Sequence, residues 1–293
     1  MTNQLRTDLL PERHRGGHDF LIPCGRYTSL ALIAAAVALS FYGVLWSYST
    51  SRYLKGFSDA IVPLEGSQEQ KTMALLSWLR NEPDRKDKST DQFYTRDPVG
   101  IVQDGHLLQV CGSASNAFMN LAESAGLRTR RLLLLNPSGS VKHVVVEVRW
   151  DDRWVVVDPS FRSVFQDHAG RALSKEDLSH PGVFQDAIRG IPNYNPEYSF
   201  EHTAHIHLTR IPELGVFLRR TLNFLFPRWE ETVNWGYLPE HPSLWPTVFS
   251  LPLFLLGIAI RMIVYSRQQF YAKNVGFRKR LIETSRIFLQ RSA

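Results

Sequence analysis

The sequence is poor in cysteine and, over two long stretches, carries no charge at all. Two cysteines, Cys24 and Cys111, occur among 293 residues, which excludes a scaffold built on several disulfides. Residues 27–51 and 242–260 contain no Asp, Glu, Lys or Arg, although the overall composition of 44% hydrophobic and 21% charged residues is average. Uncharged stretches of this length exclude an ordinary fully soluble chain and indicate contact with a membrane.

A net positive charge is also missing from the middle of the chain, because residues 27–260 contain 22 basic and 24 acidic residues. The formal net charge is +6, yet residues 261–293 alone contain eight basic residues and one acidic residue. The excess of positive charge therefore lies in the tails and not on a folded surface that could follow a phosphate backbone. This distribution predicts no nucleic-acid partner.

The uncharged stretches predict two transmembrane helices, at residues 27–51 and 243–266. At about 1.5 Å per helical residue, each apolar run matches a hydrocarbon core of about 30 Å. A cleaved signal peptide is the alternative for the first stretch, but its apolar core would be shorter. Pro246 and Pro252 in the second stretch are compatible with a membrane-spanning helix.

The positive-inside rule predicts that both tails, residues 1–26 and the basic residues 267–293, are cytoplasmic. Residues 52–242 then form an extracytoplasmic, periplasmic domain of a multi-pass inner (plasma) membrane protein, with membrane lipids as partners. Two groups of aromatic residues are predicted to mark the same membrane interface. They are Tyr42, Trp46, Tyr48 and Tyr53 after the first span, and Trp229, Trp235, Tyr237 and Trp245 before the second.

Residues 212–226 have the pattern of an amphipathic helix. Its apolar face consists of Leu214, Phe217, Leu218, Leu222 and Leu225, with Arg219 and Arg220 elsewhere. Such a helix can lie in the membrane interface or pack on the domain, and the pattern alone leaves both alternatives open.

Cys111 is the one cysteine of the predicted extracytoplasmic region. Cys24 lies on the opposite side of the first span, so the predicted topology excludes a disulfide between them. Residues 112–126 have small and apolar residues at helical spacing and end in Gly126, which places Cys111 at the start of a helix. Backbone N–H groups at a helix start favour a thiolate, as a nucleophile requires.

Strands are predicted at residues 128–135 and 141–150, with a third beginning at Arg153 after a two-residue turn. This turn pairs Trp150 with Arg153. The resulting register places Asp158 within reach of His143 on one face of the sheet and gathers five valines on the other face. A three-residue turn would divide the valines between the faces, so the two-residue register is favoured.

The order of Cys111, a histidine in HVVVEV and an aspartate in WVVVDPS resembles the transglutaminase-like superfamily of papain-type folds. The resemblance covers residues 99–180 and includes AGLRTR after the helix. It implies an α+β fold in which the nucleophile helix packs on an antiparallel sheet, here flanked by two transmembrane helices in a bacterial membrane-anchored member. It also implies that Cys111 is the nucleophile, His143 the general base and acid, and Asp158 the residue that orients His143.

Two features depart from this pattern. The hairpin turn is Asp151–Asp152, where relatives commonly have Asp-Gly. The side chain that helps to stabilise the oxyanion is not securely placed either. Gln109 and Gln103 are the candidates, and the backbone N–H of Cys111 is a more general donor.

These residues predict thiol-dependent acyl transfer or hydrolysis on peptide or carboxamide bonds, by a cysteine protease or amidase of the cell envelope with a peptide or protein substrate. One alternative is a protein-crosslinking transglutaminase. The other is a catalytically silent envelope scaffold linked to surface-polysaccharide assembly. The chemistry requires no metal or organic cofactor. His202, His205 and His207 are predicted to be structural or surface residues, because no cysteine or carboxylate accompanies them at ligand spacing.

Overall fold

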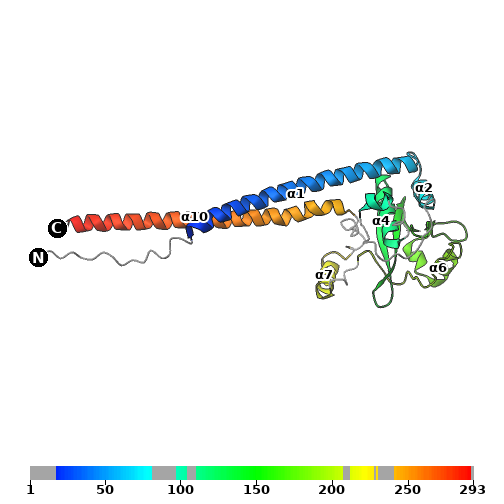
Figure 1. Cartoon of the computed structure of the whole chain (residues 1–293). Coiled ribbons are helices and arrows are strands. Elements are labelled where there is room, and N and C mark those ends of the chain that lie inside the picture. Colours follow the sequence, from blue (N-terminus) through cyan, green and yellow to red (C-terminus); the bar gives the residue numbers. More distant parts are fainter. Residues whose placement is uncertain are drawn as a thin grey trace. The chain divides into compact units, whose positions relative to one another are not determined.

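The computed structural model describes residues 18–80, 97–103, 110–206, 212–227, 229 and 241–291. The chain divides into two compact units, of which one consists of Met1–Val44 with Pro246–Ala293 and the other of Leu45–Trp245. Figure 1 shows the helices in their order along the chain. The predicted borders of the tails, the spans and the extracytoplasmic domain stay predictions.

The first unit is made from two long helices, α1 (His18–Ile61) and α10 (Trp245–Arg291). Two segments, Pro23–Ile61 in α1 and Pro242–Lys273, which includes the first part of α10, are long and apolar enough to cross a membrane. Within this unit the helices approach closely at Gly257, where an added Cβ would lie 2.8 Å from Ile33 Cγ1. A side chain at this position would therefore push the two helices apart.

The second unit opens with a helical layer. The C-terminal part of α1 is followed by α2 (Gln68–Arg80), α3 (Pro98–Gln103) and α4 (Cys111–Ser124). Leu54 of α1, Leu76 of α2 and Phe118 of α4 belong to one buried cluster. Met73 of α2 lies outside this cluster and is 38% exposed. The segment before residue 99 is thus part of the same core as the helix that carries Cys111.

A five-stranded sheet follows, with strand order β4-β3-β2-β1-β5 and antiparallel neighbours throughout. The strands are β1 (Thr129–Leu135), β2 (Val141–Trp150), β3 (Arg153–Asp158), β4 (Ser163–Val164) and β5 (Thr203–Ala204). Trp150 pairs with Arg153 and Val146 with Val157, which confirms the predicted two-residue register. Asp151 adopts a positive φ of 49°, a conformation that an aspartate tolerates in such a turn.

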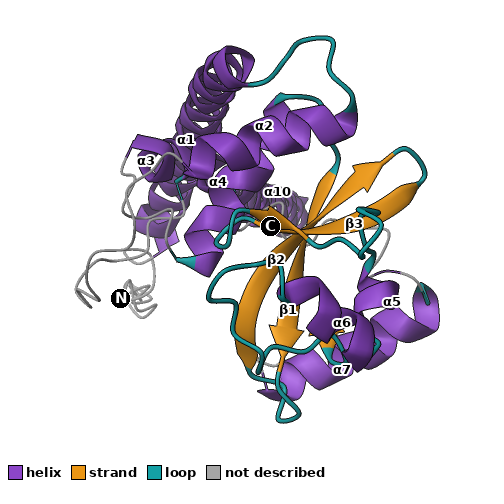
Figure 2. Cartoon of the chain, turned by 90° about the vertical axis from the view of Figure 1, so that its right-hand side faces the viewer, coloured by secondary structure: helices purple, strands orange, loops and turns teal. Residues whose placement is uncertain are grey.

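The two faces of the sheet bury different clusters. Val146, Val148, Val155 and Val157 face α2 and α4. The opposite face packs on α5 (Lys175–Leu178) and α6 (Pro181–Ile188). Figure 2 shows α2 and α4 on one side of the sheet and α5 and α6 on the other. Successive residues of β2 and β3 thus face opposite helical layers, and Val145 and Val156 belong to the cluster on the α5 and α6 side.

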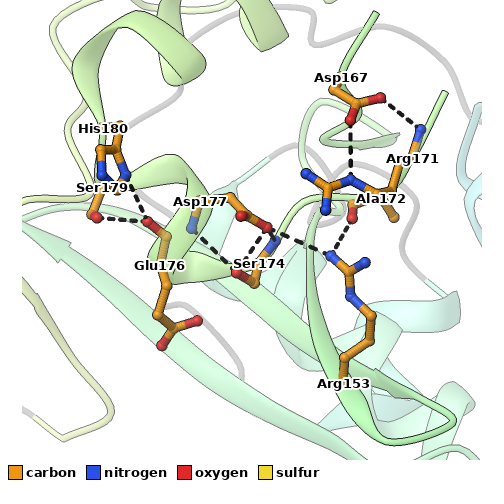
Figure 3. Close-up of polar contacts among 9 residues, drawn as sticks. All are labelled: Arg153, Asp167, Arg171, Ala172, Ser174, Glu176, Asp177, Ser179 and His180. Carbon is orange, nitrogen blue, oxygen red and sulfur yellow. Dashed lines mark hydrogen bonds and ion pairs between the residues drawn. The ribbon is translucent and has the colours of Figure 1, made fainter. Parts of the chain in front are cut away.

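Polar contacts attach α5 to the sheet (Figure 3). Ser174 and Asp177 form a capping box at the start of α5, and Arg153 donates to the carbonyl of Ala172 at 2.6 Å. The backbone N–H of Ser174 and its hydroxyl lower the pKa of Asp177 despite partial burial. These contacts fix the layer that follows β4 against the strand that ends at Asp158.

The helix predicted at residues 212–226 is present as α7 (Pro212–Leu225), and a short 3-10 helix, η4 (Pro242–Leu244), precedes α10. Phe217 and Phe224 of α7 are 66% and 85% exposed, so neither packs on the domain. Trp229 is 3% exposed and donates to Asn223 at 2.7 Å. Its assignment to the membrane interface was wrong, because this hydrogen bond and burial hold it inside the unit. Trp235 and Tyr237 lie outside the described residues.

The facing of β3 can be tested by substituting two neighbouring residues. Val157→Asp places an unpaired charge in a fully buried apolar cluster, so we expect the loss of more than about 4 kcal/mol and of cooperative unfolding. Asp158→Asn changes the opposite face with almost no change in size and should retain a cooperative transition. Thermal unfolding followed by circular dichroism measures both. If Asp158→Asn lost the cooperative transition and Val157→Asp kept it, the assignment of Val157 to the buried apolar face would be wrong.

Candidate active site

His143 is directed into the site by a bulge near the start of β2. Leu134 pairs with His143 while the next residue, Leu135, pairs with Val141, so Lys142 is the extra residue. A bulge re-aims the side chain beside it, which is why such irregularities occur next to active sites. The His143 side chain is 3% exposed, and its Nε2 lies 2.6 Å from Asp158 Oδ2.

Asp158 ends β3 and is completely buried, so its charge must be compensated within the protein. Its Oδ2 is shared by His143 Nε2 and the hydroxyl of Tyr194, which donates at 3.1 Å. Its Oδ1 accepts from the backbone N–H and the hydroxyl of Ser160, at 3.0 and 2.7 Å, and from the N–H of Phe161 at 3.2 Å. The carboxylate is therefore held rigidly by both oxygens.

Cys111 is the first residue of α4, as its sequence position predicts. The N-cap, Val110, has an extended backbone and supplies no side-chain hydrogen bond, so the cap does not use the N–H groups of the first turn. Two contacts hold this helix end to the sheet. Ser115 Oγ donates to the carbonyl of Val144 at 3.2 Å, and Arg131 donates to that of Gly112 at 3.3 Å. The structure thus brings Cys111, His143 and Asp158 together.

The three groups change one another's acidity. Burial raises the pKa of the Cys111 thiol, but the hydrogen bond and charge of His143 and the backbone N–H of Val144 lower it, and the net pKa lies below its ordinary value. Burial lowers the pKa of His143, whereas hydrogen bonds to Asp158 and Cys111 raise it to about 9. The site is therefore arranged to hold a thiolate beside an imidazolium. Since Asp158 takes Nε2, Nδ1 is the nitrogen that remains for the thiol.

Aromatic rings surround the imidazole of His143. The ring of Tyr198 stacks on it in parallel, with centroids 4.3 Å apart and planes 5° apart. Phe161 and Tyr194 meet it edge-on at 5.8 and 6.2 Å. Phe161 and its neighbour Ser160 follow directly in DPSF, a sequence in which an aspartate commonly bonds to the next N–H groups. Tyr194 and Tyr198 carry no comparable local signal, and sequence reasoning missed them.

The other predicted residues take no part in the contacts described above. Gln103 is exposed at the end of α3, and Gln109 lies outside the described residues. The oxyanion donors accordingly stay a prediction. His205 is buried against β1, where its Nδ1 lies 2.8 Å from the carbonyl of Arg131, and burial lowers its pKa. Within the described ranges, no three His, Cys, Asp or Glu side chains form a group that could hold a metal ion.

Comparison with protein families agrees with this geometry. The model of the transglutaminase-like superfamily matches residues 55–159. Residues 55–159 are a transglutaminase-like domain. The match begins earlier than residue 99, where the resemblance was expected to begin, because the end of α1 and α2 share the core of α4. It contains all three residues of the site. No curated protein and no solved structure matches the chain.

The charge state of the transglutaminase-like site predicts how its thiol reacts. On a Cys24→Ser background, Cys111 is the one thiol of the full-length protein. Iodoacetamide should alkylate it rapidly at pH 6, where an ordinary thiol with a pKa of about 8.5 is almost entirely protonated. His143→Ala removes the cationic partner but leaves the helix start, so the midpoint of the pH profile should rise.

Mass spectrometry of the alkylated protein measures these rates from pH 4 to 10. Cys111→Ser on the same background is the control and should show no labelling. A midpoint near 8.5 that His143→Ala does not change would contradict the thiolate–imidazolium pair.

Proposed function

We propose that Cys111, His143 and Asp158 form a catalytic triad that hydrolyses peptide or carboxamide bonds. The observation that carries this proposal is the 2.6 Å bond between His143 and the buried Asp158, beside a cysteine at a helix start. Burying this carboxylate is costly, and a carboxylate that orients an imidazole next to a cysteine is the arrangement that a thiol nucleophile requires. A lowered thiol pKa and a raised histidine pKa support the same proposal.

The reaction proceeds through an acyl-enzyme. The Cys111 thiolate attacks the carbonyl carbon, and the carbon–sulfur bond forms as the oxygen becomes an oxyanion near the start of α4. As this intermediate collapses, the carbon–nitrogen bond breaks and the His143 imidazolium gives its proton to the leaving amine. His143 then takes a proton from water, whose oxygen attacks the thioester; the carbon–sulfur bond breaks, the carboxylic acid is released, and the thiolate–imidazolium pair is restored. Asp158 remains ionised and holds the imidazole in place.

The chemistry of the site is compatible with two acceptors for the acyl group. Water gives a protease or amidase, and an amine gives a crosslinking transglutaminase. We favour water because it is abundant at a domain surface, whereas amine transfer requires a site that binds the amine before water reaches the thioester. The scaffold alternative, in which the triad is inactive, requires a thiol of ordinary reactivity.

We also propose that the chain spans the inner membrane twice, with both termini in the cytoplasm and the domain outside. The two candidate helices support this, since 17% and 11% of their most apolar windows are buried, and a core helix of a soluble protein would be mostly buried. Large apolar side chains on both helices face outward, among them Phe41 and Leu251, which are 65% and 60% exposed. A lipid environment would cover this surface.

Reporter fusions test the topology. Alkaline phosphatase, which is active only outside the cytoplasm, should be active when inserted near residue 170 and inactive at either terminus. A green fluorescent protein, which folds in the cytoplasm, should give the reverse pattern at residue 293. Phosphatase activity at residue 293 would rule out two spans with cytoplasmic ends.

Activity is tested on a peptide library from a bacterial lysate, with dansylcadaverine added as a competing amine. We expect new carboxyl termini that depend on Cys111, and a fall in rate above about pH 9 as His143 loses the proton that the leaving amine requires. Asp158→Asn should lower the turnover by about 10²–10⁴-fold, because His143 loses its orientation.

Mass spectrometry distinguishes the products, with Cys111→Ala as the control. Incorporation of dansylcadaverine in place of new carboxyl termini would identify amine transfer. The absence of both products, together with an ordinary thiol pKa, would support the scaffold.

A further inference from the structure

We propose that Tyr194 and Tyr198 are positioning residues of this site, which together hold the pair of His143 and Asp158 in its charged form. Both lie after α6, beyond the family match of residues 55–159. The chain would therefore complete its site with a segment outside the common domain. This inference rests on the proposed function, since it concerns the same reactive thiol.

Tyr194 acts on the carboxylate. Its hydroxyl donates at 3.1 Å to Oδ2 of Asp158, the same oxygen that lies 2.6 Å from His143 Nε2. Burial and the charge of Asp158 raise the pKa of Tyr194 far above its ordinary value, so the hydroxyl keeps its proton and remains a donor. Because the other oxygen is bound by Ser160 and Phe161, the phenol fixes the rotation of the carboxylate about its last bond.

Tyr198 acts on the imidazole. Its ring covers one face of His143 in a parallel stack, at 4.3 Å between centroids. An aromatic face attracts a cation, so the stack favours the imidazolium over the neutral ring. It also covers one side of the bond to Asp158 with an apolar surface, and a charged hydrogen bond is stronger where water is excluded.

The segment that carries both tyrosines is anchored at its two ends. On one side Tyr194 packs edge-on against Phe165 and Phe184, with ring centroids 5.5 and 6.1 Å apart. On the other side β5 pairs with β1, and the N–H of Leu135 donates to the carbonyl of His202 at 2.8 Å. The segment that carries the two tyrosines therefore has its own core contacts, and these contacts keep both side chains next to His143.

This arrangement predicts how the site responds when one partner is removed. Without the Tyr194 hydroxyl, Oδ2 loses one of its two donors and can shift relative to Nε2 while Oδ1 stays bound, so the imidazolium loses stabilisation. Without the Tyr198 ring the cation loses its aromatic face. In both cases the pKa of His143 should fall, and the pKa of Cys111 should rise because its cationic partner is less populated.

The experiment measures the pH profile of Cys111 alkylation in full-length protein on the Cys24→Ser background. Tyr194→Phe removes one oxygen and keeps the ring, and Tyr198→Leu removes the stacked ring. Each should raise the midpoint by about one pKa unit, which slows alkylation about tenfold at pH values below the wild-type midpoint. Tyr198→Phe retains a ring for stacking and should stay close to wild type.

Phe184→Leu is the matched control, because Phe184 belongs to the same apolar cluster and contacts Tyr194 but not His143 or Asp158. It should lower the thermal midpoint of unfolding and leave the alkylation midpoint unchanged. Thermal unfolding of every variant shows whether the fold is retained. If Tyr194→Phe does not fold, the alkylation midpoints of Tyr198→Leu and Tyr198→Phe still show whether the stacked ring stabilises the imidazolium.

The outcomes separate the two proposals. An ordinary midpoint in the wild type would overturn the proposed function. A low midpoint in the wild type that neither Tyr194→Phe nor Tyr198→Leu changes would overturn this inference and leave the proposed function standing. An equal shift in Phe184→Leu would also overturn it, since the effect would then come from general loss of packing.

Discussion

The buried carboxylate of Asp158 is the constraint on which the rest of the domain depends. An isolated buried charge costs several kcal/mol, so the protein must supply donors to it from several directions. Those donors come from β2, from the turn after β3 and from the segment after α6. Three parts of the chain that are distant in sequence must therefore fold together before the charge is compensated. The site and the core therefore depend on the same long-range contacts.

The sheet meets this constraint through strict alternation. In β2 and β3 the valines of one face pack on α4, and the residues between them include His143 and Asp158 on the other face. A slip of one residue would bury the carboxylate among valines, so register is specified by charge as well as by apolar burial. The bulge at Lys142 lies at the end of this pattern, where alternation can be interrupted without cost to the valine face.

These features explain which parts were predictable from sequence. Turn length, valine alternation and a helix start are local signals, and they were sufficient for the register of Trp150 with Arg153 and for the meeting of the three site residues. The contacts of Tyr194 and Tyr198 arise from packing between distant segments, which leaves no periodic pattern. Trp229 was misplaced for the same reason, since an aromatic residue near a span has the same composition signal whether it is buried or at an interface.

Charge coupling gives the site one further property. Burial penalises a lone thiolate and a lone imidazolium, and each ion stabilises the other, with Asp158 as a third charge that adds to the stabilisation of the imidazolium. The thiol and the imidazole therefore titrate as a pair, and a midpoint measured at Cys111 reports on both groups. Removing any one member withdraws the stabilisation of the others, so the effects of single substitutions should not add when they are combined. The hydrogen bond between Asp158 and His143 therefore changes the pKa of the Cys111 thiol, although no bond joins the carboxylate to the sulfur. It does so by stabilising the imidazolium, whose charge in turn stabilises the thiolate.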